Sequence, residues 1–132
     1  MGYKIFLSPP HMGDLERDYL VNAFDSNWIA PVGKNIDLFE KEASNYVNRK
    51  YALAVNSGTS ALHLSMISLG IKKNDVVLCP SFTFAASANV ILYQNATPVF
   101  VDVNIKTWTI DLILLENFGG IQEVLFTSFV LN

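Results

Sequence analysis

Three short apolar runs in the middle of the chain place the strongest limit on its fold. They cover residues 51–55, 76–79 and 98–103, and none of them alternates polar with apolar residues. Segments with helical character, 59–69 and 84–93, separate them. Strands that are covered on both faces lose the polar alternation, and parallel strands need crossover connections of this kind. We therefore predict an α/β fold in which the three runs are neighbours in a parallel sheet with helices on both faces.

The first fifty residues follow a different pattern. Apolar residues recur at helical spacing from Asp14 to Asn27 and again from about Asn35, which predicts two amphipathic helices with Asp14 as a cap. An apolar loop that contains proline and glycine, residues 28–33, lies between them. Residues 4–7 alternate weakly and are compatible with a short strand.

The composition indicates that the domain is incomplete. Hydrophobic residues make up 51% of the 132 residues and charged residues only 16%, with a mean hydropathy of +0.29. A typical globular chain is about one quarter charged, and a sheet of three strands would leave two bare edges. We expect one incomplete domain, with a helical and loop segment (1–50), a βαβαβ unit (51–111) and a divergent tail (112–132). A helix that begins near Leu112 would be interrupted by Gly119 and Gly120.

Charge and hydropathy exclude several classes of partner. The net charge of −3 gives no indication of binding to nucleic acid or to an anionic membrane surface. No run approaches the roughly 18–20 apolar residues that span a bilayer, and the N-terminus does not resemble a signal peptide. We expect a cytoplasmic protein. Its one cysteine, Cys79, lies in the apolar run VVLCP and is expected to be buried and unreactive.

The sequence NSGTSALHL places small polar residues where the first run passes into a helix. Ligands of open parallel sheets bind at such turns, where a helix offers unpaired N–H groups and partial positive charge. Gly58 would let the backbone approach an anion, and the hydroxyls of Ser57, Thr59 and Ser60 could donate to it. The alternative is that Thr59 or Ser60 only caps the helix. The turn is neither a Walker loop nor a GxGxxG dinucleotide turn.

A second turn of interest, CPSFTFAAS, follows the second apolar run. It brings Phe82 and Phe84 to the same edge of the predicted sheet. One of these rings could lie flat on a planar heteroaromatic ligand, or both could be core residues. Together the two turns predict a phosphorylated planar cofactor.

These motifs resemble the pyridoxal-phosphate sugar aminotransferases of the DegT/StrS type. The segments that carry the likeness, which extends over about residues 5–115, are NSGTSALHLSM, DVVLCPSFTFAASANVILYQNATPVFVDV and TWTID. The opening segments SPPHM and SNWIAP are similar to the branch that aminates UDP-4-keto-6-deoxy sugars on the route to bacillosamine-type sugars. The resemblance implies the N-terminal portion of the large domain of a fold-type I aminotransferase.

The resemblance also assigns roles to individual residues. It implies that the residues that hold pyridoxal 5'-phosphate are Ser57, Gly58, Thr59 and Phe84, with Phe84 stacked on the pyridine ring. The residues that it places near the substrate sugar are Trp28, Ile29 and Ala30. His63 is expected to pack within its helix, and Asp102 to hold the turn into TWTID.

No catalytic residue and no metal ligand are assigned to this sequence. In the family, the lysine that forms the Schiff base and the aspartate that pairs with the pyridine nitrogen lie farther along the chain. From about Gly119 the sequence departs from the expected pattern, as a frameshifted or truncated end would.

The implied activity is transfer of an amino group, from glutamate, to the keto carbon of a UDP-4-keto-6-deoxy sugar in the biosynthesis of cell-surface polysaccharide or glycan. The partners are a nucleotide sugar and an amino donor, and the intact enzyme is expected to be a homodimer. Two alternatives stay open: a non-catalytic truncated remnant, and a sugar dehydratase of the same fold in which histidine replaces the lysine. We expect this chain alone to be inactive.

Overall fold

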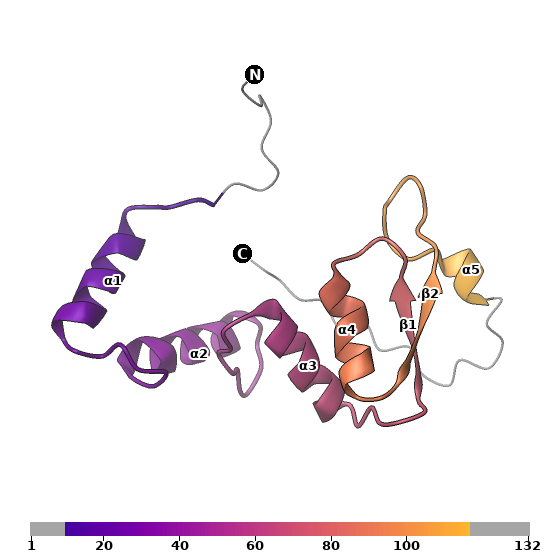
Figure 1. The fold of residues 1–132 in the computed structure, drawn as a ribbon. Coiled ribbons are helices and arrows are strands. Elements are labelled where there is room, and N and C mark those ends of the chain that lie inside the picture. The colour runs from indigo at the N-terminus through magenta and orange to yellow at the C-terminus, as the bar shows by residue number, and fades with distance from the viewer. Residues whose placement is uncertain (1–9, 117–132) are drawn as a thin grey trace, which may run out of the picture. The chain divides into compact units, whose positions relative to one another are not determined.

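The computed structural model describes residues 10–116 (Figure 1). The chain divides into two compact units, Met1–Ala54 and Val55–Asn132. The expected short strand at 4–7 and the glycine pair at 119–120 lie outside the described residues. Within the described part of the chain, no helix is long and apolar enough to cross a membrane.

The first unit contains two helices, α1 (Leu15–Asp25) and α2 (Lys34–Tyr46), which confirms both amphipathic predictions. Asp14 flanks α1 but its side chain makes no capping hydrogen bond, because its backbone is already helical (φ −80°, ψ −28°). Acidic residues in the first turns of both helices favourably face the positive end of the helix dipole.

The second unit has α/β architecture (Figure 1). Its elements in chain order are α3 (Gly58–Ser68), β1 (Val76–Pro80), α4 (Ala85–Tyr93), β2 (Thr97–Val101) and α5 (Leu112–Glu116). Strands β1 and β2 pair in parallel, with Val76 opposite Thr97 and Pro80 opposite Val101. Helix α4 is the crossover between them; it packs on both strands and against α3. The predicted α/β fold and the parallel pairing of the second and third apolar runs are confirmed.

The first apolar run, residues 51–55, is not a strand, so the prediction of three parallel neighbours is wrong for this run. Tyr51 and Leu53 are 77% and 69% exposed. The Ala54 N–H donates instead to the Glu40 carboxylate, at 2.8 Å from Oε1. A β-strand forms only where its backbone N–H and C=O groups make hydrogen bonds with a neighbouring strand. In the described residues no segment pairs with this run.

The core of the second unit lies between α4 and the sheet. Its buried cluster consists of Cys79 on β1, Ile91 on α4 and Ala96 just before β2. Met66 of α3 and Ile71 pack against this cluster. Cys79 is buried, as predicted, and burial raises the pKa of its thiol, so the reactive thiolate is disfavoured.

The positions of Ile91 and Leu92 on α4 allow a direct test of this core. Ile91 is 1% exposed and its neighbour Leu92 is 55% exposed. We expect Ile91→Ala to lower the free energy of unfolding by about 2–4 kcal/mol, because it removes buried methyl groups and leaves a cavity. The matched change Leu92→Ala should cost less than about 1 kcal/mol. Urea unfolding followed by circular dichroism measures both, and equal losses would contradict this description of the core.

Candidate functional site

The start of α3 is capped by Ser57, which precedes the first helical residue. Ser57 has extended backbone angles (φ −163°, ψ 157°), and its Oγ accepts the Ser60 N–H at 3.1 Å. Its carbonyl oxygen accepts the Ala61 N–H. The alternative with Thr59 or Ser60 as the cap is therefore wrong, since both residues already lie inside the helix.

A directed chain of hydroxyl groups runs beside this cap. The Ser60 hydroxyl donates to Asn56 Oδ1 at 2.8 Å, so its single proton is used there. The Ser57 and Ser60 oxygens are 3.0 Å apart, and Ser57 must be the donor in that pair. Two of the three hydroxyls that the sequence offered to an anion are thus occupied within the turn. The Thr59 hydroxyl has no hydrogen-bond partner in the described part of the chain.

Two backbone donors stay available at the same place. Among the described residues, no acceptor binds the N–H of Gly58 or of Thr59. A Cβ atom added at Gly58 would meet nothing within 4 Å, so the space beside the glycine is open. The first turn of α3 carries no acidic residue. Unpaired N–H groups, the positive end of the helix dipole and open space are the features that favour an anion at a helix start, so this turn is a candidate anion seat.

The turn after β1 presents two aromatic rings in different environments. Phe82 lies edge-on to Trp108, with ring centroids 5.0 Å apart and an interplanar angle of 69°. Phe84 flanks the start of α4, is 88% exposed, and has no ring partner among the described residues. Neither is a core residue, so that alternative is wrong. Of the two rings, Phe84 has the freer face for stacking on a planar ligand.

Asp102 has the structural role that the sequence analysis expected. Its Oδ1 accepts the Val103 N–H at 2.8 Å and the Ser81 hydroxyl at 2.9 Å. These two hydrogen bonds, the Val103 bond first, hold the pKa of the carboxyl below its usual value and keep it ionised. The Asp102 carbonyl oxygen also accepts the Asp111 N–H.

His63 packs as expected. Its ring lies edge-on to Tyr93 of α4, with centroids 5.3 Å apart, and this contact joins α3 to α4. Because α4 packs against α3, the anion seat and Phe84 belong to helices that touch one another, and Figure 1 shows the two helices side by side.

The apolar loop of the first unit is organised around Gly33. Its backbone (φ +134°, ψ 177°) is open to glycine alone, and a Cβ there would approach Cε3 of Trp28 to 3.1 Å. Trp28 and Ala30 line a hollow of about 330 Å³ between the end of α1 and the start of α2. Ile29, the third residue expected near a substrate sugar, is 70% exposed and is not part of the lining.

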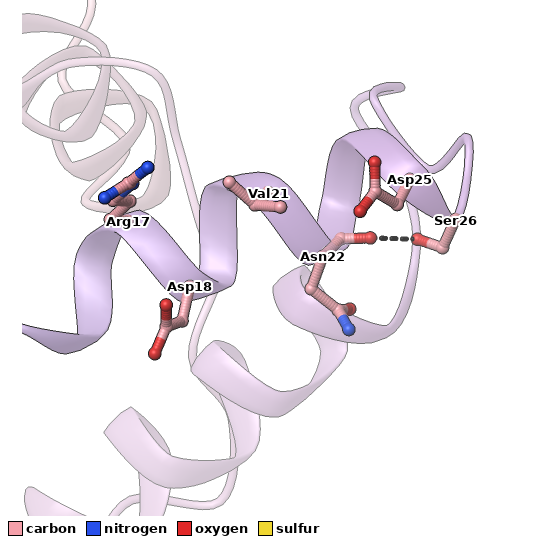
Figure 2. Close-up of a pocket in the computed structure, with 6 residues that line it drawn as sticks. All are labelled: Arg17, Asp18, Val21, Asn22, Asp25 and Ser26. Atoms are coloured by element: carbon pink, nitrogen blue, oxygen red, sulfur yellow. Dashed lines mark hydrogen bonds between the residues drawn. The ribbon is translucent and has the colours of Figure 1, made fainter.

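A larger hollow of about 620 Å³ runs along α1 and was not predicted from the sequence (Figure 2). Arg17 and Asp18 point to different sides of the helix there, and the hydrogen bond drawn joins the Ser26 hydroxyl to the Asn22 carbonyl oxygen. No set of polar groups converges in it. In residues 10–116 no group of three or more His, Cys, Asp or Glu side chains could hold a metal ion.

Comparison with known proteins gives a consistent result. The profile of the DegT/DnrJ/EryC1/StrS aminotransferase family matches residues 10–118. EpsN of Bacillus subtilis, assigned as a pyridoxal-phosphate-dependent aminotransferase, is 49% identical over 116 residues, which are 88% of this chain and 30% of EpsN. GDP-perosamine synthase of Caulobacter vibrioides is 42% identical over 113 residues, 86% of this chain and 30% of that protein.

A solved structure agrees with these relatives. The pyridoxal-phosphate form of Spr1654 from Streptococcus pneumoniae, assigned as a sugar aminotransferase, has a TM-score of 0.76 and 35% identity over 87% of this chain and 29% of its own. The chain thus spans about 30% of the length of the relatives that it matches. This chain belongs to the DegT/DnrJ/EryC1/StrS aminotransferase family.

Proposed function

We propose that this chain supplies the phosphate seat and one stacking face for pyridoxal 5'-phosphate in a sugar aminotransferase. The observation that carries the proposal is the pair of N–H groups on Gly58 and Thr59, which have no acceptor among the described residues and border open space. The pyridoxal-phosphate and pyridoxamine-phosphate forms of the pneumococcal protein support this choice of ligand.

Each residue of the seat has a separate task. The two N–H groups donate to phosphate oxygens, and the Thr59 hydroxyl can add a third donor. Ser57 does not need to touch the phosphate, because its hydroxyl holds the first turn of α3 in place through the Ser60 N–H. In this proposal Ser57 therefore shapes the seat while Gly58 and Thr59 bind.

Phe84 is proposed to cover one face of the pyridine ring and to keep water from it. The ring is 88% exposed, so one of its faces is open to a planar ligand. When bound, the cofactor supplies an electron sink that stabilises negative charge on the reacting carbon. The lysine and aspartate that complete such a site are expected outside this sequence.

The proposed reaction moves an amino group, from glutamate, to the keto carbon of a UDP-4-keto-6-deoxy sugar. Support for a nucleotide sugar comes from the relatives named GDP-perosamine synthase, and the choice of UDP rests on the resemblance of the opening segments. Trp28, Ile29 and Ala30 are proposed to lie near the sugar. We also propose that the enzyme is a homodimer in the cytoplasm and serves cell-surface polysaccharide or glycan biosynthesis.

Two substitutions of the capping residue Ser57 distinguish an effect on phosphate binding from an effect on the stability of the fold. Asp and Asn cap helices about equally well, so Ser57→Asp and Ser57→Asn should unfold at similar urea concentrations. The aspartate places a negative charge beside the seat, and we expect it to weaken inorganic phosphate binding about tenfold relative to the asparagine variant, or ~1.4 kcal/mol. Titration followed by the amide shifts of Gly58 and Thr59 measures the affinity. Equal affinities of the two variants, or shifts confined to other amides, would contradict the proposed seat.

A chimera tests the proposed activity in a complete enzyme. Residues 10–118 replace the matching segment of the Caulobacter GDP-perosamine synthase, to which they are similar. We expect the chimera to transfer an amino group to its keto sugar, and Phe84→Ala in the chimera to lower kcat/KM at least tenfold. The isolated chain, as control, should show no product and no specific, stoichiometric cofactor adduct at one lysine after borohydride reduction.

The same chimera tests the assignment of the substrate and one of the two alternatives. A gain of activity with a UDP-4-keto-6-deoxy sugar would support the UDP assignment, and activity with the GDP sugar alone would contradict it. The dehydratase alternative needs a different test, because the Caulobacter protein supplies the position at which histidine would replace the lysine. A folded but inactive chimera would favour the non-catalytic remnant.

A further inference from the structure

The turn that presents Phe84 is tied to the end of β2 through Ser81. The Ser81 N–H donates to the Val101 carbonyl oxygen at 2.8 Å, and its hydroxyl donates to Asp102 Oδ1 at 2.9 Å. The same carboxylate oxygen accepts the Val103 N–H. One ionised side chain therefore joins the segment that leaves β1 to the segment that leaves β2.

The next residue of the turn, Phe82, is held by a small hairpin that follows β2. An antiparallel bridge joins Val103 to Ile110. The Asn104 N–H donates to the Thr109 carbonyl oxygen at 2.9 Å. The Trp108 N–H donates to the Asn104 carbonyl oxygen at 2.8 Å. The hairpin brings the Trp108 ring edge-on to Phe82.

Trp108 adopts an uncommon conformation to make this contact. Its φ is +59°, a region that bulky L-residues rarely enter. Such backbone strain persists only where surrounding contacts fix it, and it clusters at functional sites. Here the contacts are the Asn104 carbonyl oxygen on one side and the Phe82 ring on the other.

The Phe84 ring itself is fixed by none of these groups. It is 88% exposed, and no ring contact joins it to another described residue. The backbone (φ −62°, ψ 142°) therefore sets the direction in which the Cα–Cβ bond leaves the chain, and with it the positions that the ring can reach. That backbone is held from the N-terminal side by Ser81 and Phe82, and the Thr83–Ser87 hydroxyl pair at 2.9 Å spans it.

We propose that Asp102 and Trp108 are positioning residues for Phe84: together they brace the turn 81–84 and so set the direction of the exposed ring. The inference rests on the proposed stacking role of Phe84. Neither residue touches the cofactor in this scheme. Both act through the turn, Asp102 by the bond to Ser81 and Trp108 by the contact with Phe82.

A fluorine label on Phe84 measures the brace directly and without cofactor. 4-Fluorophenylalanine is placed at position 84 of the full chain, and its ¹⁹F resonance is recorded. We expect Asp102→Ala and Trp108→Ala each to shift or broaden the resonance beyond its linewidth. The conservative changes Asp102→Asn, which keeps an acceptor oxygen, and Trp108→Phe, which keeps an aromatic edge, should restore most of the original signal.

Two further variants distinguish a local effect on the turn from a general loss of structure. Ser81→Ala removes one hydroxyl and keeps the backbone bond to Val101, so it should reproduce the effect of Asp102→Ala even where that variant unfolds. Thr107→Ala is the matched control, because its hydroxyl pairs with Thr109 inside the hairpin and not with the turn. If the resonance stays unchanged in Trp108→Ala, Trp108 is not a positioning residue. If it stays unchanged in both Asp102→Ala and Ser81→Ala, Asp102 is not a positioning residue.

The effect on the cofactor is measured separately, with pyridoxal 5'-phosphate and inorganic phosphate as two probes. Asp102→Ala should weaken pyridoxal phosphate binding about fivefold, leave phosphate binding within twofold, and have no further effect in a Phe84→Ala background. A loss that persists without Phe84 would show a merely structural role and overturn the inference. If Phe84→Ala alone changes nothing, the stacking proposal fails while the ¹⁹F result still decides the brace.

Discussion

The parallel pairing of β1 with β2 is the constraint on which the second unit depends. Parallel strands end at the same edge of a sheet, so the chain leaves both strands side by side. The turn after β1 can therefore reach the residues after β2, and Ser81 does so with both its N–H and its hydroxyl. An antiparallel pair would have sent the two exits to opposite ends. The candidate site exists because the crossover helix α4 returns the chain in the same direction.

Much of this fold could be predicted from the sequence because local signals and burial agree there. Apolar residues at helical spacing predicted α1 and α2, and the segments between the apolar runs predicted α3 and α4. Gly70, with φ +74°, follows α3 at the position typical of a glycine that ends a helix. The failure at residues 51–55 has a physical cause. A run of apolar side chains indicates that a segment tends to be buried, whereas a strand also needs a neighbouring strand for its backbone hydrogen bonds. The pattern of apolar residues in a segment does not show whether such a neighbour is present.

The sequence indicated where a candidate site could lie but not the hydrogen bonds within it. Small polar residues before a helix marked the seat, yet three hydroxyls looked equivalent until Asn56 fixed the direction in which Ser60 and Ser57 donate. The pattern FTF likewise did not distinguish its two rings. The rings differ because Phe82 contacts Trp108, a non-glycine residue with a positive φ that no local propensity favours. Long-range contacts decide such features.

The open space at Gly58 has a consequence for how this position responds to selection. Its backbone is ordinary and no atom crowds its missing side chain, so an alanine would be accepted by the fold and would even favour the helix by up to about 1 kcal/mol. A library sorted for folded, protease-resistant molecules would therefore enrich substitutions here. Under the proposed function, glycine is required here for the space that the anion occupies. On that proposal, sorting for stability and sorting for ligand binding select opposite residues at position 58.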